Sequence, residues 1–338
     1  MCFHENCHTL FIEVLHRDTY NEASERREAF SMKLSVFGFQ ALWSPYFLCV
    51  ILIVSVLFFV SATTWRHRFL VSEPLTKAQA VYFSLAMMLL YIVKGTPIDV
   101  LAHISFTMHM VQMALLLLFV PIVLIKGIPW WMWQAFISLR IIRPVWRVLT
   151  QPIVSLFTFT LLFSFYHIPV ILDVVKLSEP LHAAYTGLLF SSAVWMYWSL
   201  LHPIPDSKEV KDLHKIGIVM ANAVLITPAC ALIIFADTPM YETYIAGDAW
   251  LQSMALCVPA STLAMLPSLG VMGPELFMSM STLEDQQLGG IVMKIIQEII
   301  FGALLYSIFR KWYKNEQKNA DAITAAALEE RKAMSQYY

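Results

Sequence analysis

The sequence predicts an all-α polytopic membrane protein, a seven-transmembrane-helix bundle with the N-terminus outside and the C-terminus inside. Three observations lead to this prediction: the composition, the length of the apolar stretches and the placement of positive charge. Of the 338 residues, 58% are hydrophobic and 14% are charged, and the mean hydropathy is +0.63. Soluble domains carry roughly 25% charged residues, so a water-soluble fold is not expected.

Seven apolar stretches approach or exceed the length that a membrane span requires. A bilayer core of about 30 Å needs roughly 20 helical residues at 1.5 Å each. Proline, glycine or charged residues bracket each stretch, as they commonly do at helix ends. The predicted spans lie near residues 45–65, 77–95, 99–125, 150–171, 181–202, 215–236 and 287–309.

Two further segments with apolar character are not counted as spans. Prolines and a glycine interrupt residues 249–271, so we expect this segment to be re-entrant or to lie on the surface. An eighth span there would also move the basic C-terminal tail to the outside. The loop 126–150 mixes tryptophan with arginine, which is typical of a helix lying in the membrane interface.

The orientation follows from the positions of lysine and arginine, which are retained in short cytoplasmic loops. These residues concentrate in the first, third and fifth connections and in the C-terminal tail, whereas residues 237–285 contain none. The prediction is therefore N-out and C-in. We divide the chain into a polar N-terminal extension that precedes a more natural start, a seven-helix membrane domain and a charged cytoplasmic tail: residues 1–31, 32–310 and 311–338.

Nucleic acid is not an expected partner of this chain. The net charge is −1, and the sequence contains neither a glycine-rich phosphate loop nor a dinucleotide-binding fingerprint. The five cysteines are odd in number, and three of them stand in apolar stretches, so we expect no framework of disulfides.

Four histidines fall inside the predicted spans or at their ends, where ionisable residues are costly and mark functional sites. His103 and His109 belong to the third span, His167 ends the fourth and His182 opens the fifth. In the predicted topology, His103, His167 and His182 converge near the outer surface. If the third span is one continuous helix, His109 lies about 9 Å deeper than His103.

Sulfur donors accompany these histidines, because Met110 and Met113 share their face of a continuous third helix. Imidazole and thioether ligands both suit copper, and thioethers favour Cu(I). We therefore predict a copper site made by His103, His109, Met113, His167 and His182. Six further residues are predicted to support these ligands or to contact a partner protein: Asp99, Met110, Gln112, Asp285, Gln286 and Gln287.

The seventh span begins with two recognisable local features. Ser281 can cap this helix, with Glu284 at the third helical position completing a capping box. Gly289 and Gly290 permit a neighbouring helix to approach closely, so this end of the span is expected to pack near the histidines.

Together these residues resemble the CtaG family of bacterial cytochrome c oxidase assembly factors, of the Bacillus type. The resemblance covers nearly all of residues 32–310, and Met113 stands where many members have a further histidine, which keeps a copper-compatible donor. It is carried by Asp99, His103, His109, Met110, Gln112, His167, Pro169, His182 and the run from Glu284 to Gly290.

The resemblance implies a multi-pass protein of the bacterial plasma membrane that is not an enzyme. It would bind copper, as Cu(I), and hand it over for maturation of the haem-copper centre of cytochrome c oxidase. The implied partners are the oxidase subunit that carries this centre, other copper-delivery factors on the outer face, and the lipid bilayer.

Two other functions stay open on the sequence alone. The first is a haem-binding membrane electron carrier, in which histidines on facing helices are the axial ligands of haem. In this chain, however, His103 and His109 would bind different haem groups. A small-solute or ion transporter would be expected to carry broken-helix repeats, and none is evident in the sequence.

Overall fold

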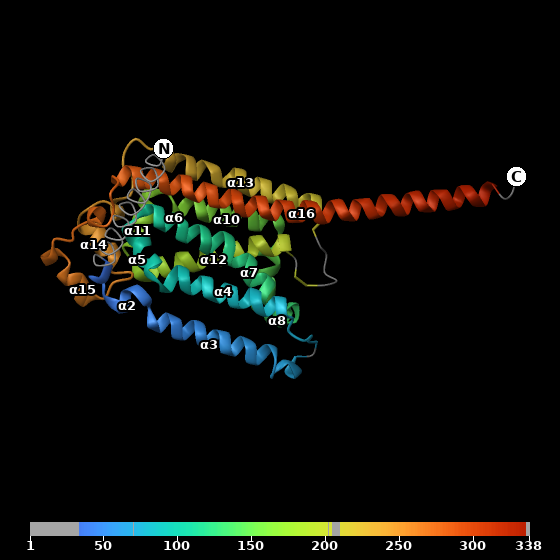
Figure 1. Cartoon of the computed structure of the whole chain (residues 1–338), viewed down its shortest axis with the longest axis horizontal. Coiled ribbons are helices and arrows are strands. Elements are labelled where there is room, and N and C mark those ends of the chain that lie inside the picture. The colour runs from blue at the N-terminus through green and yellow to red at the C-terminus, as the bar shows by residue number, and fades with distance from the viewer. Residues whose placement is uncertain (1–33, 70, 202, 205–209, 336–338) are drawn as a thin grey trace, which may run out of the picture.

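A computed structural model describes residues 34–69, 71–201, 203–204 and 210–335. The described residues form helices and connecting turns and contain no strand, so the predicted all-α class is confirmed. The long helices lie side by side along one axis, and short helices gather at one end of this bundle (Figure 1). The predicted N-terminal extension, residues 1–31, lies outside the described residues.

Five helices are long and apolar enough to cross a membrane, or up to six if the bent pair α9 (Ile142–Leu149) and α10 (Pro152–Tyr166) is one span. The protein is thus a membrane protein by helix length and composition. The five include α13 and the joined pair α2 and α3, and their bounds are Gly38–Ala62, Lys77–Gly95, Phe106–Gly127, Asp212–Ile234 and Thr282–Glu329. Helix α12 (Glu179–Leu201) occupies the predicted fifth position with 23 residues. The count of seven stays a prediction.

Local sequence explains where several helices begin. Helix α4 (Lys77–Gly95) starts at a capping box, in which Thr76 accepts from the amide of Gln79 and the Gln79 side chain accepts from the amide of Thr76. Helix α16 (Thr282–Ser335) starts at the predicted box of Ser281 and Glu284, with reciprocal bonds of 2.8 and 3.3 Å. Its 54 residues run beyond the bundle, because the tail is rich in helix-forming alanine, lysine and glutamate (Figure 1).

The third predicted span is not one continuous helix, and this part of the prediction is wrong. The chain forms α5 (Pro97–Ile104) and α6 (Phe106–Ala114), separated by Ser105 in an extended conformation. A π-helical turn, Leu115–Phe119, then leads into α7 (Val120–Gly127). His103 and His109 therefore stand on different helices, and the depth of 9 Å and the shared face expected between them do not apply.

The carboxylate of Asp285 explains why the break is tolerated. It accepts hydrogen bonds from the Ser105 hydroxyl at 2.7 Å, the Phe106 amide at 2.6 Å and the Thr107 amide at 3.2 Å. The exposed amides at the start of a helix need such acceptors, above all where water is excluded. Ser105 is 6% exposed, so the non-helical backbone between α5 and α6 is buried inside the protein.

The glycine pair of α16 lets this helix pack against two neighbours at once. A Cβ atom at Gly289 would lie 2.7 Å from Phe106 of α6, and one at Gly290 would lie 2.7 Å from Ile234 of α13 (Asp212–Ile234). Both distances are too short for real carbon atoms. The predicted close approach beside the histidines is therefore confirmed.

The two segments not counted as spans are built from short helices. Residues 249–271 contain most of α14 (Asp248–Met254) and all of α15 (Ala260–Met265), which are too short to span, and Trp250 packs with Phe37 and Ile104. The predicted interfacial helix is two helices, α8 (Trp130–Ile137) and α9. Trp133 and Trp146 are buried against Trp198, each with ring centroids 5.0 Å away, and the interfacial position of the segment stays a prediction.

Candidate histidine site at one end of the bundle

The four predicted histidines form two pairs of rings. His103 of α5 faces His182 of α12, with ring centroids 5.7 Å apart. His109 of α6 faces His167, which caps the end of α10, at 6.4 Å. His103, His109 and His167 are at most 4% exposed. The sequence grouped His167 with His103 and His182, whereas the structure pairs it with His109.

Each of these four rings keeps one buried nitrogen without a hydrogen-bond partner. The atoms are Nδ1 of His103, Nε2 of His109, Nε2 of His167 and Nδ1 of His182. Buried polar atoms are ordinarily paired, so four unpaired nitrogens in one region call for an explanation. A bound metal ion is one that suits imidazole.

The tautomer of His167 follows from its one hydrogen bond. Its Nδ1 lies 2.8 Å from the carbonyl oxygen of Phe163, and a carbonyl oxygen can only accept. Nδ1 therefore carries the proton, and the lone pair of the neutral ring is on Nε2, which faces the site without a partner. A backbone carbonyl that fixes the tautomer in this way is the usual arrangement behind a metal-binding histidine.

The spacing within each pair fits two nitrogen donors on one ion. Two imidazoles bound at about 2 Å to a shared metal have ring centroids roughly 5–6.5 Å apart, depending on the bond angle. Both observed spacings fall in this range. No group of three or more His, Cys, Asp or Glu among the described residues could hold a metal. Met110 and Met113 are buried in the hydrophobic cluster that also contains Phe163 and Tyr166, whose rings contact His167.

Aromatic rings surround His109 of the second pair. The ring centroids of Phe106, Tyr166 and Tyr244 lie 5.8–6.0 Å from that of His109. The Tyr241 hydroxyl donates to the carbonyl oxygen of His167 at 2.8 Å, which holds the backbone that positions this ring. Sequence reasoning missed both loop tyrosines, because nothing in the acidic loop indicated that they fold back into the bundle.

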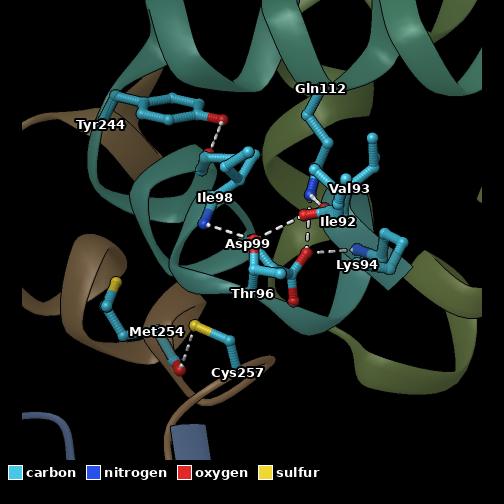
Figure 2. A network of polar contacts seen from close by, with 11 residues as sticks. Ile92, Val93, Lys94, Thr96, Ile98, Asp99, Gln112, Tyr244, Met254 and Cys257 are labelled. Atoms are coloured by element: carbon cyan, nitrogen blue, oxygen red, sulfur yellow. Dashed lines mark hydrogen bonds and ion pairs between the residues drawn. The ribbon is translucent and has the colours of Figure 1, made fainter. Parts of the chain in front are cut away.

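Asp99 joins three helices, and Figure 2 shows two side chains reaching its carboxylate. Its Oδ1 accepts from Nζ of Lys94 at 2.6 Å and from Nε2 of Gln112 at 2.7 Å. The same Gln112 nitrogen also donates to the carbonyl oxygen of Val93 at 2.8 Å. This network ties the end of α4 to α5 and α6, so Asp99 and Gln112 support the position of the helices that carry His103 and His109.

The other predicted supporting residues also make internal contacts. Asp285 caps α6, and it is 1% exposed. The Gln286 side chain accepts from the Met240 amide at 2.8 Å, and Gln287 donates to the carbonyl oxygen of Ala236 at 2.9 Å. Met110 is fully buried beneath Gly289. Both predicted roles of these residues, support of the site and contact with a partner protein, stay predictions.

A buried lysine beside the site is a residue that the sequence analysis counted only as a loop charge. Lys176 ends α11 (Pro169–Lys176), is 0% exposed, and its Nζ lies 3.7 Å from the ring of Tyr244 without a hydrogen-bond partner. Burial lowers the pKa of this amine to about 7. The hydrophobic run around it was the signal that could have revealed its burial.

The fold is that of a helical membrane protein with two pairs of histidines at one end of its bundle, three of them buried. A family model described as cytochrome c oxidase caa3 assembly factor (Caa3_CtaG) matches residues 56–315, which include all four histidines. The chain belongs to this family. No match was found among curated proteins or among solved structures.

Proposed function

We propose that this protein binds Cu(I) at the two histidine pairs and hands it over during maturation of the haem-copper centre of cytochrome c oxidase. The family assigns oxidase assembly, and the oxidase is the partner that this role implies. The observation that carries the copper step is the set of four buried imidazole nitrogens without partners, arranged as two facing pairs. Binding and release of an ion need no catalytic turnover.

Cu(I) is the ion that suits this donor set best. It accepts low coordination numbers and soft ligands, so two imidazoles with or without a thioether would satisfy it. Met113 is 2% exposed and comes one helical turn after His109. The helices of one pair pack against those of the other, α5 against α6 and α12 against α10, so an ion could pass from one pair to the other within the bundle.

The proposed topology has seven spans, with α10 and α12 completing the five long apolar helices. The N-terminus is outside and the C-terminus in the cytoplasm of a bacterial cell, because lysine and arginine concentrate at the end of the bundle opposite the histidines. A reporter fused after Lys318 should be active only in the cytoplasm, and one inserted in residues 237–248 only outside. The reverse pattern would overturn this orientation.

In this topology the histidine pairs lie near the outer surface, where other copper-delivery factors would supply the ion. A haem-binding carrier is less well supported. A porphyrin between His109 and His167 would need the space that Phe106, Tyr166 and Tyr244 fill. A Soret band in the purified protein would decide for haem.

The decisive experiment is metal analysis of the full chain after purification in detergent and loading with Cu(I). The wild type should retain copper, and His103→Ala and His109→Ala should each lose most of it, together with oxidase assembly in cells. The conservative variant His109→Gln and a thermal unfolding curve for each protein separate loss of the ligand from loss of the fold.

His67→Ala is the matched control, because His67 is exposed at the opposite end of the bundle. It should retain copper as the wild type does. Unchanged copper in the His103 and His109 variants, or an equal loss in the His67 variant, would refute the copper site.

A further inference from the structure

A cavity of about 420 Å³ lies at the end of the bundle opposite the histidines. Helices α7, α12, α13 and α16 surround it where α16 leaves the bundle (Figure 1). We call this end the lysine end and the other the histidine end. The volume falls in the range of roughly 300–1,000 Å³ that is typical of small-molecule sites.

The charged residues of this cavity gather at its mouth. Lys126 stands near the end of α7, Lys215 and Asp212 stand in the first turn of α13, and Lys311 lies where α16 emerges. Asp212 lies 3.8 Å from Nζ of Lys215 and 4.0 Å from Nζ of Lys311. Among the described residues that line the cavity, three are therefore positive and one is negative.

The depth of the cavity is apolar. Its wall on α16 runs from Ile299 to Lys311, which is about 18 Å along the helix axis. Below the lysine, this wall is made of isoleucine, leucine and alanine with one serine. Phe119 of the π-helical turn, Ile122 of α7 and Leu200 of α12 line the other sides. Ile299 is 65% exposed on the side of the bundle, so the apolar part also opens towards the surrounding lipid.

This arrangement has the polarity of a lipid molecule, with cations at one end and hydrocarbon walls along the membrane axis. Basic pockets between transmembrane helices on the cytoplasmic side suit anionic headgroups. We propose that the cavity binds one anionic phospholipid, with its phosphodiester at Lys126, Lys215 and Lys311 and an acyl chain along α16. The site is separate from the histidine pairs, and this proposal does not rest on copper handling.

The test uses the full chain, purified in detergent and stripped of lipid. Phosphatidylglycerol and phosphatidylcholine with identical acyl chains are added in separate arms, and inorganic phosphate is the third arm. Retained lipid is measured by native mass spectrometry, and stability by thermal unfolding. Phosphatidylglycerol should be retained and should raise the unfolding temperature, whereas phosphatidylcholine and phosphate should do neither.

Two variants locate the site. Lys126→Ala combined with Lys311→Ala should weaken phosphatidylglycerol binding roughly tenfold or more, since each lysine near an anionic headgroup contributes substantially. Ala303→Phe keeps every charge but fills the apolar part, and it should also abolish retention. Lys314→Ala, an exposed lysine one turn further along α16, is the matched control and should bind as the wild type does.

Three outcomes would overturn the proposal. Equal retention of the two lipids would show that the charged mouth does not select the headgroup. Stabilisation by phosphate alone would reduce the site to a free-anion site. Full phosphatidylglycerol binding by the double lysine variant or by Ala303→Phe would place any bound lipid elsewhere.

Discussion

The histidine end and the lysine end of the bundle both carry ionisable residues, but they differ in burial. At the histidine end, Asp285, His103 and Lys176 are at most 3% exposed. At the lysine end, the side chain of Lys311 is 53% exposed and Lys126 is exposed as well, whereas Lys215 is 3% exposed and has Asp212 as a partner. Water solvates Lys126 and Lys311 at little cost, whereas the buried groups need internal partners or a ligand. The difference indicates that the histidine end carries the functional site.

The largest expected effect comes from removing a buried acceptor at the histidine end. Asp285→Ala deprives two backbone amides and the Ser105 hydroxyl of their partner. Hydrogen bonds to a charged group are strong, and orphaned buried donors are costly, so we expect a loss of about 3–5 kcal/mol in the free energy of unfolding. Thermal unfolding in detergent measures it, and copper retention should fall because α6 carries His109.

Asp212→Ala is the counterpart at the lysine end. Its ion pairs are long, at 3.8 and 4.0 Å, and Lys311 is half exposed, so the loss should be smaller than the loss for Asp285→Ala. If both aspartate variants lose the same stability, burial is not what distinguishes the two ends.

A second prediction uses two glycines of the same helix. A Cβ at Gly289 would lie 2.7 Å from Phe106, whereas Gly302 has open space around it. Gly289→Ala should therefore cost about 1–3 kcal/mol, because α16 must move away from α6. Gly302→Ala should be neutral or stabilise by up to about 1 kcal/mol, since alanine favours the helix. Unfolding curves of the two variants test this, and equal effects would contradict the close packing at the histidine end.

Much of the fold could be predicted because its signals are local. Helix α4 has the bounds predicted from the sequence, since Thr76 and Gln79 cap its start and Pro97 follows its end. The capping box of α16 is local too, and the four histidines were chosen because apolar spans rarely contain them.

The arrangement of the site could not be predicted, because its causes are distant in the chain. The break at Ser105 is stabilised by a carboxylate 180 residues away, and the only local signal for it is that serine is a preferred residue at the start of a helix. Pairing His109 with His167 depends on that break. The burial of Lys176 likewise depends on Tyr244, which returns from a loop.

A third prediction concerns the pH dependence that buried Lys176 creates. The folded amine loses its proton near pH 7, whereas an unfolded lysine keeps it until about pH 10.4. Between these values the unfolded state binds more protons, so stability rises with pH by up to about 1.4 kcal/mol per unit. Below pH 7 both states are protonated, and the unfavourable contribution of the buried charge is constant.

Lys176→Met isolates this contribution, because it keeps the length of the side chain and removes the amine. From pH 7 to 8.5 the wild type should gain stability relative to the variant, as measured by thermal unfolding at each pH. Parallel profiles would mean that Lys176 keeps its proton in the folded protein.

The smallest expected effect comes from replacing exposed helix caps, and it tests whether burial or position in the bundle determines the loss of stability. Both ends of the bundle contain an exposed capping box, Thr76 with Gln79 at the lysine end and Ser281 with Glu284 at the histidine end. Replacing an exposed cap by alanine costs roughly 1 kcal/mol, because water partly solvates the amide that is released. Thr76→Ala and Ser281→Ala should therefore lose similar stability in thermal unfolding, even though Ser281 stands only four residues before Asp285. A loss for Ser281→Ala that approached the loss for Asp285→Ala would mean that the whole histidine end, and not its buried groups alone, is sensitive to substitution.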